Sequence, residues 1–178
     1  MKVQQRKIIA IVGLMGVGKT TISAKLAEKL KFYFIDCDQE IEDREHKSIA
    51  EIFSQNGEKY FRQIEAQTIA EISERDEEIV LSLGGGAFMN DDTRKLLKEK
   101  AITIWLFAPI DEILQRIGHK NNRPLLNQKN KREVLEELAL KRYPTYEEAD
   151  LKFNTAETNN EILVRKIIQK INELKNAK

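Results

Sequence analysis

A short glycine-rich stretch near the start of the chain has the residue types of a phosphate-binding loop. Residues 13–20 read GLMGVGKT and match the P-loop pattern G-x-x-x-x-G-K-[ST]. Such a loop points several backbone N–H groups at one anion, and glycine reaches the necessary φ values without strain. Lys19 can place its charge on the β- and γ-phosphates, and the Thr20 hydroxyl can bind Mg²⁺. The stretch therefore predicts a site for a nucleoside triphosphate.

A second group of candidate residues is acidic and follows an expected strand. Residues 31–36 combine aromatic and β-branched side chains, which favour a strand, and Asp36-Cys37-Asp38 stands at its carboxyl end. Open α/β sheets bind ligands outside the carboxyl ends of their strands, so these acids could meet a bound nucleotide and Mg²⁺. The alternative interpretation of this acidic pair is a helix cap.

Three consecutive glycines, Gly84, Gly85 and Gly86, follow an apolar strand at residues 79–83. Because three glycines cost backbone entropy, a close approach of the backbone to a ligand explains them better than a simple turn. Arg62 and Glu65 lie three residues apart in an expected helix, and by spacing alone we interpret them as a solvated ion pair.

A polar segment at residues 118–130 contains Pro124, which interrupts any helix, and has the composition of a mobile loop. On a kinase scaffold such a loop can close over phosphates and bring in an arginine. Arg123 is therefore a candidate for transition-state stabilisation, and its alternative is a solvated surface charge.

The elements around these candidates alternate between strand and helix. Residues 8–12 are a continuous apolar run before the glycine loop, typical of a buried parallel strand. Ile22, Leu26 and Leu30 recur beyond it at helical spacing, which predicts a helix that begins at the glycine loop. The positive N-terminal end of this helix dipole would then point at the phosphates. Further strands are expected at residues 101–107 and 151–154. The alternation predicts a parallel sheet. The last helix should pack on the sheet through Ile162, Ile167, Ile168, Ile171 and Leu174.

Composition limits the other possibilities. The chain has 178 residues, which fit a single domain, and its net charge of +1 suggests no nucleic-acid or membrane partner. One cysteine, Cys37, excludes an internal disulfide and is consistent with a reducing compartment. The apolar run after Lys7 ends too soon at Gly13 for a signal peptide. We expect a cytoplasmic monomer.

Six elements in this order resemble those of shikimate kinase, and the resemblance spans nearly the whole chain. The P-loop alone is shared by many unrelated NTPases, whereas the combination is specific. The six elements are residues 13–20, residues 36–38, Phe61-Arg62 with Glu65, residues 84–86, residues 123–126, and Arg142 with Tyr146.

The resemblance implies an α/β fold of the P-loop kinase type, with three α/β/α layers around a five-stranded parallel sheet. It implies one kinase domain over residues 1–178, with a substrate-binding helical region at about 36–75 and a mobile lid at about 118–130. The implied reaction transfers the γ-phosphate of ATP, with Mg²⁺, to the 3-hydroxyl of shikimate, on the route to chorismate and the aromatic amino acids.

The resemblance also implies roles for single residues. Lys19, Asp38 and Arg123 would be catalytic, with Asp38 holding shikimate hydroxyls and orienting the nucleophile. Whether Asp38 also takes the proton stays open. The remaining implied sets are as follows: ATP would bind Gly13, Gly16, Val17, Gly18, Lys19, Thr20, Thr21, Arg116 and Arg123; Mg²⁺ would bind Thr20 and, through water, Asp36; shikimate would bind Asp38, Arg62, Gly84, Gly85, Gly86 and Arg142; and Glu65 would orient an arginine.

Two alternatives and one departure accompany this interpretation. A related small-molecule kinase, such as a gluconate kinase or a nucleoside monophosphate kinase, shares the P-loop and lid but needs no paired-arginine carboxylate site. A regulatory GTPase is disfavoured because the chain has no N-K-x-D and no D-x-x-G after a strand. Residues 155–160 contain no arginine, unlike the same loop of some relatives, so the adenine side is the least defined part of the site.

Overall fold

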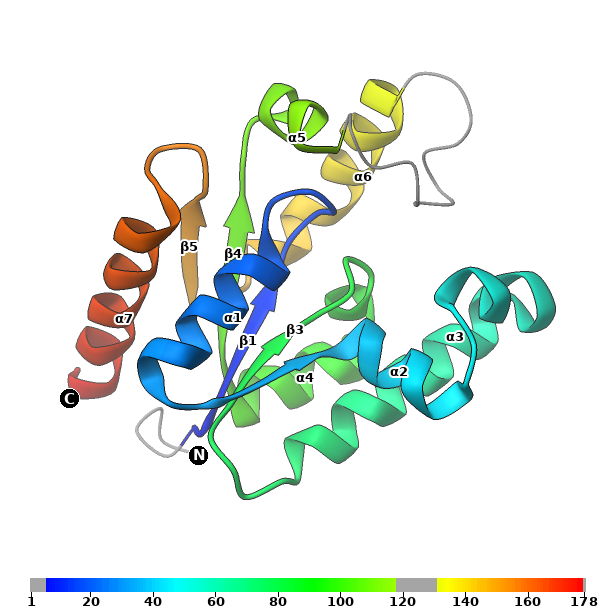
Figure 1. Ribbon diagram of the computed structural model, residues 1–178, viewed down its shortest axis with the longest axis horizontal. Helices are drawn as coiled ribbons and strands as arrows, with labels where there is room; N and C mark the ends of the chain where they lie inside the picture. The colour runs from blue at the N-terminus through cyan, green and yellow to red at the C-terminus, as the bar shows by residue number, and fades with distance from the viewer. Residues whose placement is uncertain (1–5, 118–130, 178) are drawn as a thin grey trace.

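The computed structural model describes residues 6–117 and 131–177 of the chain. Its centre is a five-stranded parallel sheet, as the family resemblance implied, and its strand order is β2-β3-β1-β4-β5 (Figure 1). The strands are β1 (Ile8–Val12), β2 (Tyr33–Asp36), β3 (Ile79–Ser82), β4 (Ala101–Phe107) and β5 (Leu151–Asn154). Because all neighbours are parallel, the carboxyl ends of the strands meet at one edge, which is the upper edge in Figure 1.

Helices cover both faces of this sheet and complete the three layers. The helical elements are α1 (Lys19–Leu30), α2 (Cys37–Glu45), α3 (Ile49–Ser73), the short 3₁₀ helix η2 (Ala87–Met89), α4 (Asp91–Lys100), α5 (Ile110–Ile117), α6 (Lys131–Tyr146) and α7 (Asn160–Asn176). Helices α1 and α7 pack together on one face, and α4 packs against β4 and α3 on the other (Figure 1).

The apolar runs of the sequence form the core. All five residues of β1 are buried between β3 and β4, and β3 is buried throughout. Parallel strands covered by helices on both faces have no solvent side, so their sequences read as continuous apolar runs. The central strand therefore holds the P-loop rigidly at the carboxyl edge.

One strand boundary differs from the sequence expectation. The second strand begins at Tyr33 and not at residue 31, because Lys31 closes α1 in the left-handed conformation, its N–H donating to the carbonyls of Ala27 and Glu28. Helix α3 is kinked at Gly57, which has a φ of +81°. A capping box of Ser48 and Glu51 begins this helix.

Helices α6 and α7 each have a feature that local sequence rules do not indicate. Helix α6 continues two residues beyond Pro144, and the residue whose carbonyl loses its partner, Leu140, is 83% exposed, so water can replace the lost bond. In α7, Ile162 is exposed, contrary to the expectation that it packs on the sheet. Leu163, Val164, Ile167 and Ile171 are buried there, and the expected Ile168 and Leu174 are partly buried against the core.

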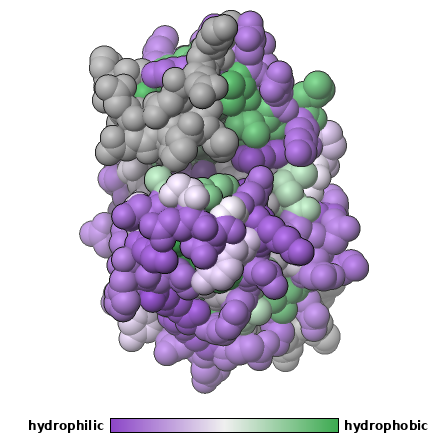
Figure 2. All heavy atoms as spheres, turned by 90° about the vertical axis from the view of Figure 1, so that its right-hand side faces the viewer, coloured by the Kyte–Doolittle hydropathy of each residue, from purple (hydrophilic) through white to green (hydrophobic). Residues whose placement is uncertain are grey.

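The outer surface beside α2 and α3 is dominated by hydrophilic residues (Figure 2). Within the described part of the chain, no helix is both long and apolar enough to cross a bilayer. The hydrophobic residues of these helices instead face inward, as Ile41 of α2 and Ile52, Phe61 and Ile69 of α3 do.

Candidate active site

The P-loop lies between β1 and α1 with the backbone that its glycines predict. Gly13, Gly16 and Gly18 have φ values of +149°, +82° and +96°, a region that side chains with a Cβ rarely adopt. The Lys19 Nζ donates to the carbonyls of Gly13 and Leu14, both at 3.0 Å, so the ammonium lies across the mouth of the loop. Loop and lysine together form a cradle for an anion.

An open cavity of about 460 Å³ begins at this cradle. Its far side is the loop after β5, which contributes Thr155, Ala156, Thr158 and Asn160. Arg116 of α5 bridges the two sides, donating to the Thr155 hydroxyl at 2.8 Å and to the Val17 carbonyl at 3.3 Å. The nucleotide residues expected from the sequence that line the cavity are Gly16, Val17, Gly18, Lys19, Thr20, Thr21 and Arg116.

Two oxygen atoms that could act as Mg²⁺ ligands lie next to each other beside the P-loop. The Thr20 hydroxyl donates to Asp36 Oδ2 at 2.9 Å, so the two expected metal-binding residues share one location. Mg²⁺ prefers oxygen ligands, keeps several waters, and takes further ligands from phosphates. Among residues 6–117 and 131–177, no cluster of three His, Cys, Asp or Glu forms a site made by protein alone. The donors present therefore fit a metal that arrives with a nucleotide.

The three glycines after β3 lie where the other candidate residues converge. A Cβ built on Gly84 would lie 2.8 Å from both Asp38 Oδ1 and Glu65 Oε1. On Gly85 it would lie 2.8 Å from an Arg142 nitrogen, and on Gly86 it would overlap the Arg62 guanidinium. These side chains come from α2, α3 and α6, and the bare backbone of the glycines lets them approach.

The glycine segment also touches the P-loop. The same built Cβ of Gly85 would lie 3.4 Å from the Gly13 carbonyl, which accepts the Lys19 bond. The acidic and basic groups around the glycines therefore lie next to the cradle, as phosphoryl transfer between two bound substrates requires.

Arg62 and Glu65 form a largely buried ion pair, and the interpretation as a solvated pair was wrong. An Arg62 nitrogen lies 2.6 Å from Glu65 Oε2, and the Glu65 side chain is only 3% exposed. The other carboxylate oxygen, Oε1, is buried with no partner among the described residues. Burial raises the pKa of Glu65, whereas Arg62 opposes this shift. Packing against the glycine segment excludes the water that spacing alone would allow.

Asp38 occupies the first turn of α2, on the acceptor side of the cradle. Asp36 is the N-cap of that helix and accepts from the Asp38 N–H at 3.1 Å, so the acidic pair is a helix cap and also lies beside the P-loop. Burial raises the pKa of Asp38 and nearby Asp36 raises it further, while Lys19 and Arg62 lower it. Cys37 is the first residue of α2, and its side chain is buried.

Comparison with known proteins decides among the kinase types. The family model described as "Shikimate kinase" matches residues 15–172. The chain belongs to the shikimate kinase family. The curated shikimate kinase of Novosphingobium aromaticivorans is 40% identical over 93% of this chain and 87% of its own length. That of Caulobacter vibrioides is 43% identical over 91% of this chain and 80% of its own length.

Comparison with solved structures leads to the same family. The shikimate kinase from Acinetobacter baumannii in complex with shikimate has a TM-score of 0.88 and 38% identity, covering 96% of this chain and 95% of its own. A gluconokinase from Sinorhizobium meliloti has a TM-score of 0.57 at 15% identity, which shows only a common fold. The activity of this shikimate kinase family member is ATP-dependent phosphorylation of shikimate, a step of aromatic amino acid biosynthesis.

One expected part of the site is not described by the structure, and two of its residues were not singled out from the sequence. Arg123 and the expected lid at residues 118–130 lie outside the described residues. Tyr146 was only part of a motif in the sequence, but it is fully buried and its hydroxyl donates to the Gly85 carbonyl. Thr155 had no signal beyond lying in a loop, yet it accepts two bonds from Arg116.

Proposed function

We propose that the chain transfers the γ-phosphoryl group of Mg-ATP to the 3-hydroxyl of shikimate, with the P-loop as the donor half and the glycine segment as the acceptor half. The observation that carries this assignment is the convergence of Asp38, Arg62 and Arg142 on three consecutive glycines beside the P-loop. Guanidinium groups bind carboxylates, and a carboxylate accepts hydrogen bonds from hydroxyls. The acceptor half thus matches a small hydroxylated carboxylate.

In the donor half, the P-loop N–H groups and Lys19 hold the phosphates, and the cavity leading to Thr155 and Asn160 receives the nucleoside. Thr20 and, through water, Asp36 hold the metal, which when bound supplies positive charge that neutralises the phosphate oxygens. Arg116 connects the phosphate and adenine ends through its bonds to Val17 and Thr155. This bridge explains how the adenine side can be built without an arginine in residues 155–160.

In the acceptor half, Arg62 and Arg142 take the shikimate carboxylate, and Glu65 orients Arg62 through their 2.6 Å pair. Asp38 accepts a hydrogen bond from the attacking hydroxyl and aligns it with the γ-phosphate. Its raised pKa brings it closer to the value of a useful proton acceptor, although alignment alone already favours phosphoryl transfer. We further propose that the protein works as a cytoplasmic monomer.

The lid arginine is proposed from the sequence alone. Arg123 would stabilise charge on the transferring phosphoryl group, a contribution of roughly 10³ to 10⁵ in rate when an arginine acts in this way. We expect Arg123→Ala to depress kcat far more than it weakens shikimate binding. Turnover close to the wild-type rate in that variant would exclude the role.

The proposed acceptor is tested by a coupled assay for ADP release with purified protein, Mg-ATP and one acceptor at a time. Shikimate should support turnover, whereas gluconate and nucleoside monophosphates should give only the background rate of ATP hydrolysis. The position of the new phosphate on the product, read by ³¹P–¹H correlation, should be the 3-hydroxyl. Preferential phosphorylation of gluconate or a nucleotide would overturn the proposal.

A further inference from the structure

The glycine segment and the end of α6 are joined at two points. At the first, the Tyr146 hydroxyl donates to the Gly85 carbonyl, and the Phe88 and Tyr146 rings lie 6.5 Å apart between centroids. Burial raises the pKa of Tyr146 to about 12, so the hydroxyl keeps its proton and remains a donor at any working pH. This contact fixes the middle glycine from the inside of the molecule.

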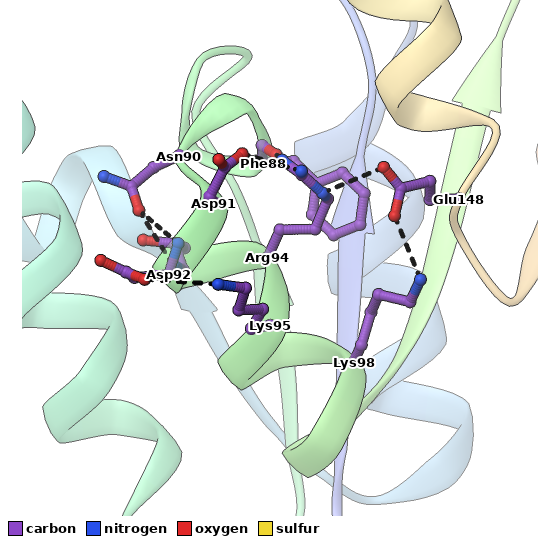
Figure 3. Close-up of polar contacts among 9 residues, drawn as sticks. Phe88, Asn90, Asp91, Asp92, Arg94, Lys95, Lys98 and Glu148 are labelled. Carbon is purple, nitrogen blue, oxygen red and sulfur yellow. Dashed lines mark hydrogen bonds and ion pairs between the residues drawn. The ribbon is translucent and has the colours of Figure 1, made fainter.

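The second point is a polar cluster on the outer side, centred on Arg94 of α4 (Figure 3). Arg94 donates to the Phe88 carbonyl at 3.1 Å, and its Nε lies 3.2 Å from a carboxylate oxygen of Glu148. Glu148 lies two residues beyond the end of α6, and its N–H donates to the Thr145 carbonyl in the last turn of that helix. Arg94 therefore ties the backbone of η2 to the end of α6.

The glycines and η2 form one continuous turn. The Ala87 N–H donates to the Gly84 carbonyl at 3.1 Å, and the Met89 N–H donates to the Gly86 carbonyl at 3.0 Å. A group that holds Phe88 therefore also holds the glycines on either side of Gly85. Without such contacts, three consecutive glycines would have more backbone freedom than any other tripeptide.

The same end of α6 carries Arg142. Arg142 and Tyr146 are four residues apart, so they lie on one face of the helix, and both reach Gly85. On the proposed function, Arg142 and the glycine backbone bind the same substrate. Their relative position must then be set by the contacts between α6 and the glycine segment.

We propose that Tyr146 and Arg94 are positioning residues for the acceptor site: together they clasp residues 84–89 to the C-terminal end of α6, so that Arg142 and the glycine backbone meet shikimate as one rigid unit. The inference rests on the proposed acceptor site. Neither residue need touch the substrate: Arg94 acts through the η2 backbone, and Tyr146 acts through the Gly85 carbonyl and through its side-chain hydrogen bond with Arg142.

Each positioning residue has a matched control in its own helix. Tyr143 belongs to the same aromatic cluster, with its ring 5.0 Å from that of Trp105, but its buried hydroxyl has no partner among the described residues. Lys98 of α4 donates to the same Glu148 carboxylate at 3.1 Å but makes no described bond to the η2 backbone. Tyr143→Phe and Lys98→Gln therefore remove similar groups without opening the clasp.

Steady-state kinetics with both substrates varied tests the acceptor part of the proposal. In Tyr146→Phe and Arg94→Gln, the KM for shikimate should rise about tenfold, the change expected for one lost hydrogen bond at the site. The KM for ATP and kcat should stay within about threefold, since the donor half is untouched. Tyr143→Phe and Lys98→Gln should stay within about twofold on every constant. Equal effects on both KM values, or test variants that behave like their controls, would overturn the proposal.

Hydrogen exchange of the backbone amides at residues 85–89 tests the clasp without any substrate. Exchange should be faster in Tyr146→Phe and Arg94→Gln than in the wild type, and unchanged in Tyr143→Phe and Lys98→Gln. If Tyr146→Phe did not fold, Arg94→Gln, at a partly exposed helix surface, would decide alone. A wild type that fails to phosphorylate shikimate would overturn the proposed function, whereas unchanged exchange in the test variants would overturn the clasp itself.

Discussion

The two halves of the site both depend on glycine, but for different physical reasons. In the P-loop, Gly18 has a φ of +96° and open space where a Cβ would lie, so conformation alone demands glycine there. In the acceptor half, Gly86 has an ordinary φ of −99°, but a Cβ would overlap the Arg62 guanidinium. The P-loop glycines thus all need a positive φ, to which Gly13 and Gly16 add crowding, whereas the acceptor-half glycines are required only by the space left for side chains from elsewhere.

This difference predicts that the acceptor half depends on the side chains that α2, α3 and α6 bring to the glycines. Asp38→Asn keeps the size of the side chain but removes the charge that aligns the attacking hydroxyl. We expect kcat to fall by about 10² to 10⁴, the range for loss of a catalytic acid–base group. ATP affinity, measured by calorimetry, should be nearly unchanged because the phosphates are held by the P-loop. A kcat near the wild-type value would contradict any catalytic role for Asp38.

The carboxylate site gives the next largest effect. Arg62→Ala and Arg142→Ala each remove a charged hydrogen-bond donor, which contributes about 1.5–3 kcal/mol. The Kd for shikimate, measured by calorimetry, should therefore rise roughly 10- to 150-fold while the Kd for ATP stays constant.

Arg44 provides the control for this pair of variants. It also forms an ion pair with a glutamate of α3, Glu71, but both side chains are about 40% exposed. Arg44→Ala should leave both dissociation constants unchanged, since exposed pairs contribute little. Unchanged shikimate affinity in both Arg62→Ala and Arg142→Ala would remove these arginines from the site.

The contrast between the glycines can be tested directly by adding one methyl group. Gly85→Ala places its Cβ 2.8 Å from an Arg142 nitrogen, so we expect the KM for shikimate to rise about tenfold, as for one lost charged contact. Gly18→Ala meets no atom within 4 Å but strains a positive φ, which costs about 1–2 kcal/mol. It should lower thermal stability and raise the KM for ATP.

Gly57, at the kink of α3, provides a control in which backbone strain arises outside the proposed site. Its φ is +81° and a Cβ there would also meet nothing within 4 Å. Gly57→Ala should lose stability as Gly18→Ala does, yet keep both KM values. If Gly18→Ala and Gly85→Ala raised the same KM, the division into conformational and spatial glycines would be wrong.

The same contrast explains which parts could be predicted from the sequence. The P-loop is one contiguous segment between an apolar run and a helix, so local patterns were enough to place Lys19 and Thr20. The acceptor half joins residues far apart along the chain, and no local pattern relates Tyr146 to Gly85 or Arg94 to Glu148. The roles of Arg62 and Arg142 were predicted only through the family resemblance.

Errors arose where tertiary packing overrode local pattern. Spacing alone indicated a solvated Arg62–Glu65 pair, because the close approach of α3 to the glycine segment cannot be read from the helix itself. In α7, Ile162 fits an apolar face by type, but the stripe that packs inward begins at Leu163. The sheet was predicted well because burial on both faces leaves a continuous apolar signal.

The smallest expected effect concerns stability and has the opposite sign to the loss of activity. Burial and Asp36 raise the pKa of Asp38, so the folded protein holds this proton to higher pH than the unfolded chain does. Between the ordinary and the raised pKa the native state binds more protons, and the free energy of unfolding falls as pH rises. Asp38→Asn lacks this loss, so at neutral pH it should be more stable than the wild type.

Thermal melting across pH checks the sign. The advantage of Asp38→Asn should shrink as the pH falls below the ordinary aspartate range, where both states of the wild type are protonated. Asp76 is a control of opposite sign, because its hydrogen bond with Lys7 lowers its pKa. Its contribution is present at neutral pH and lost in acid, so Asp76→Asn should not stabilise the protein. A neutral-pH melting temperature of Asp38→Asn at or below that of the wild type would mean that burying the Asp38 carboxylate does not lower the stability of the folded protein.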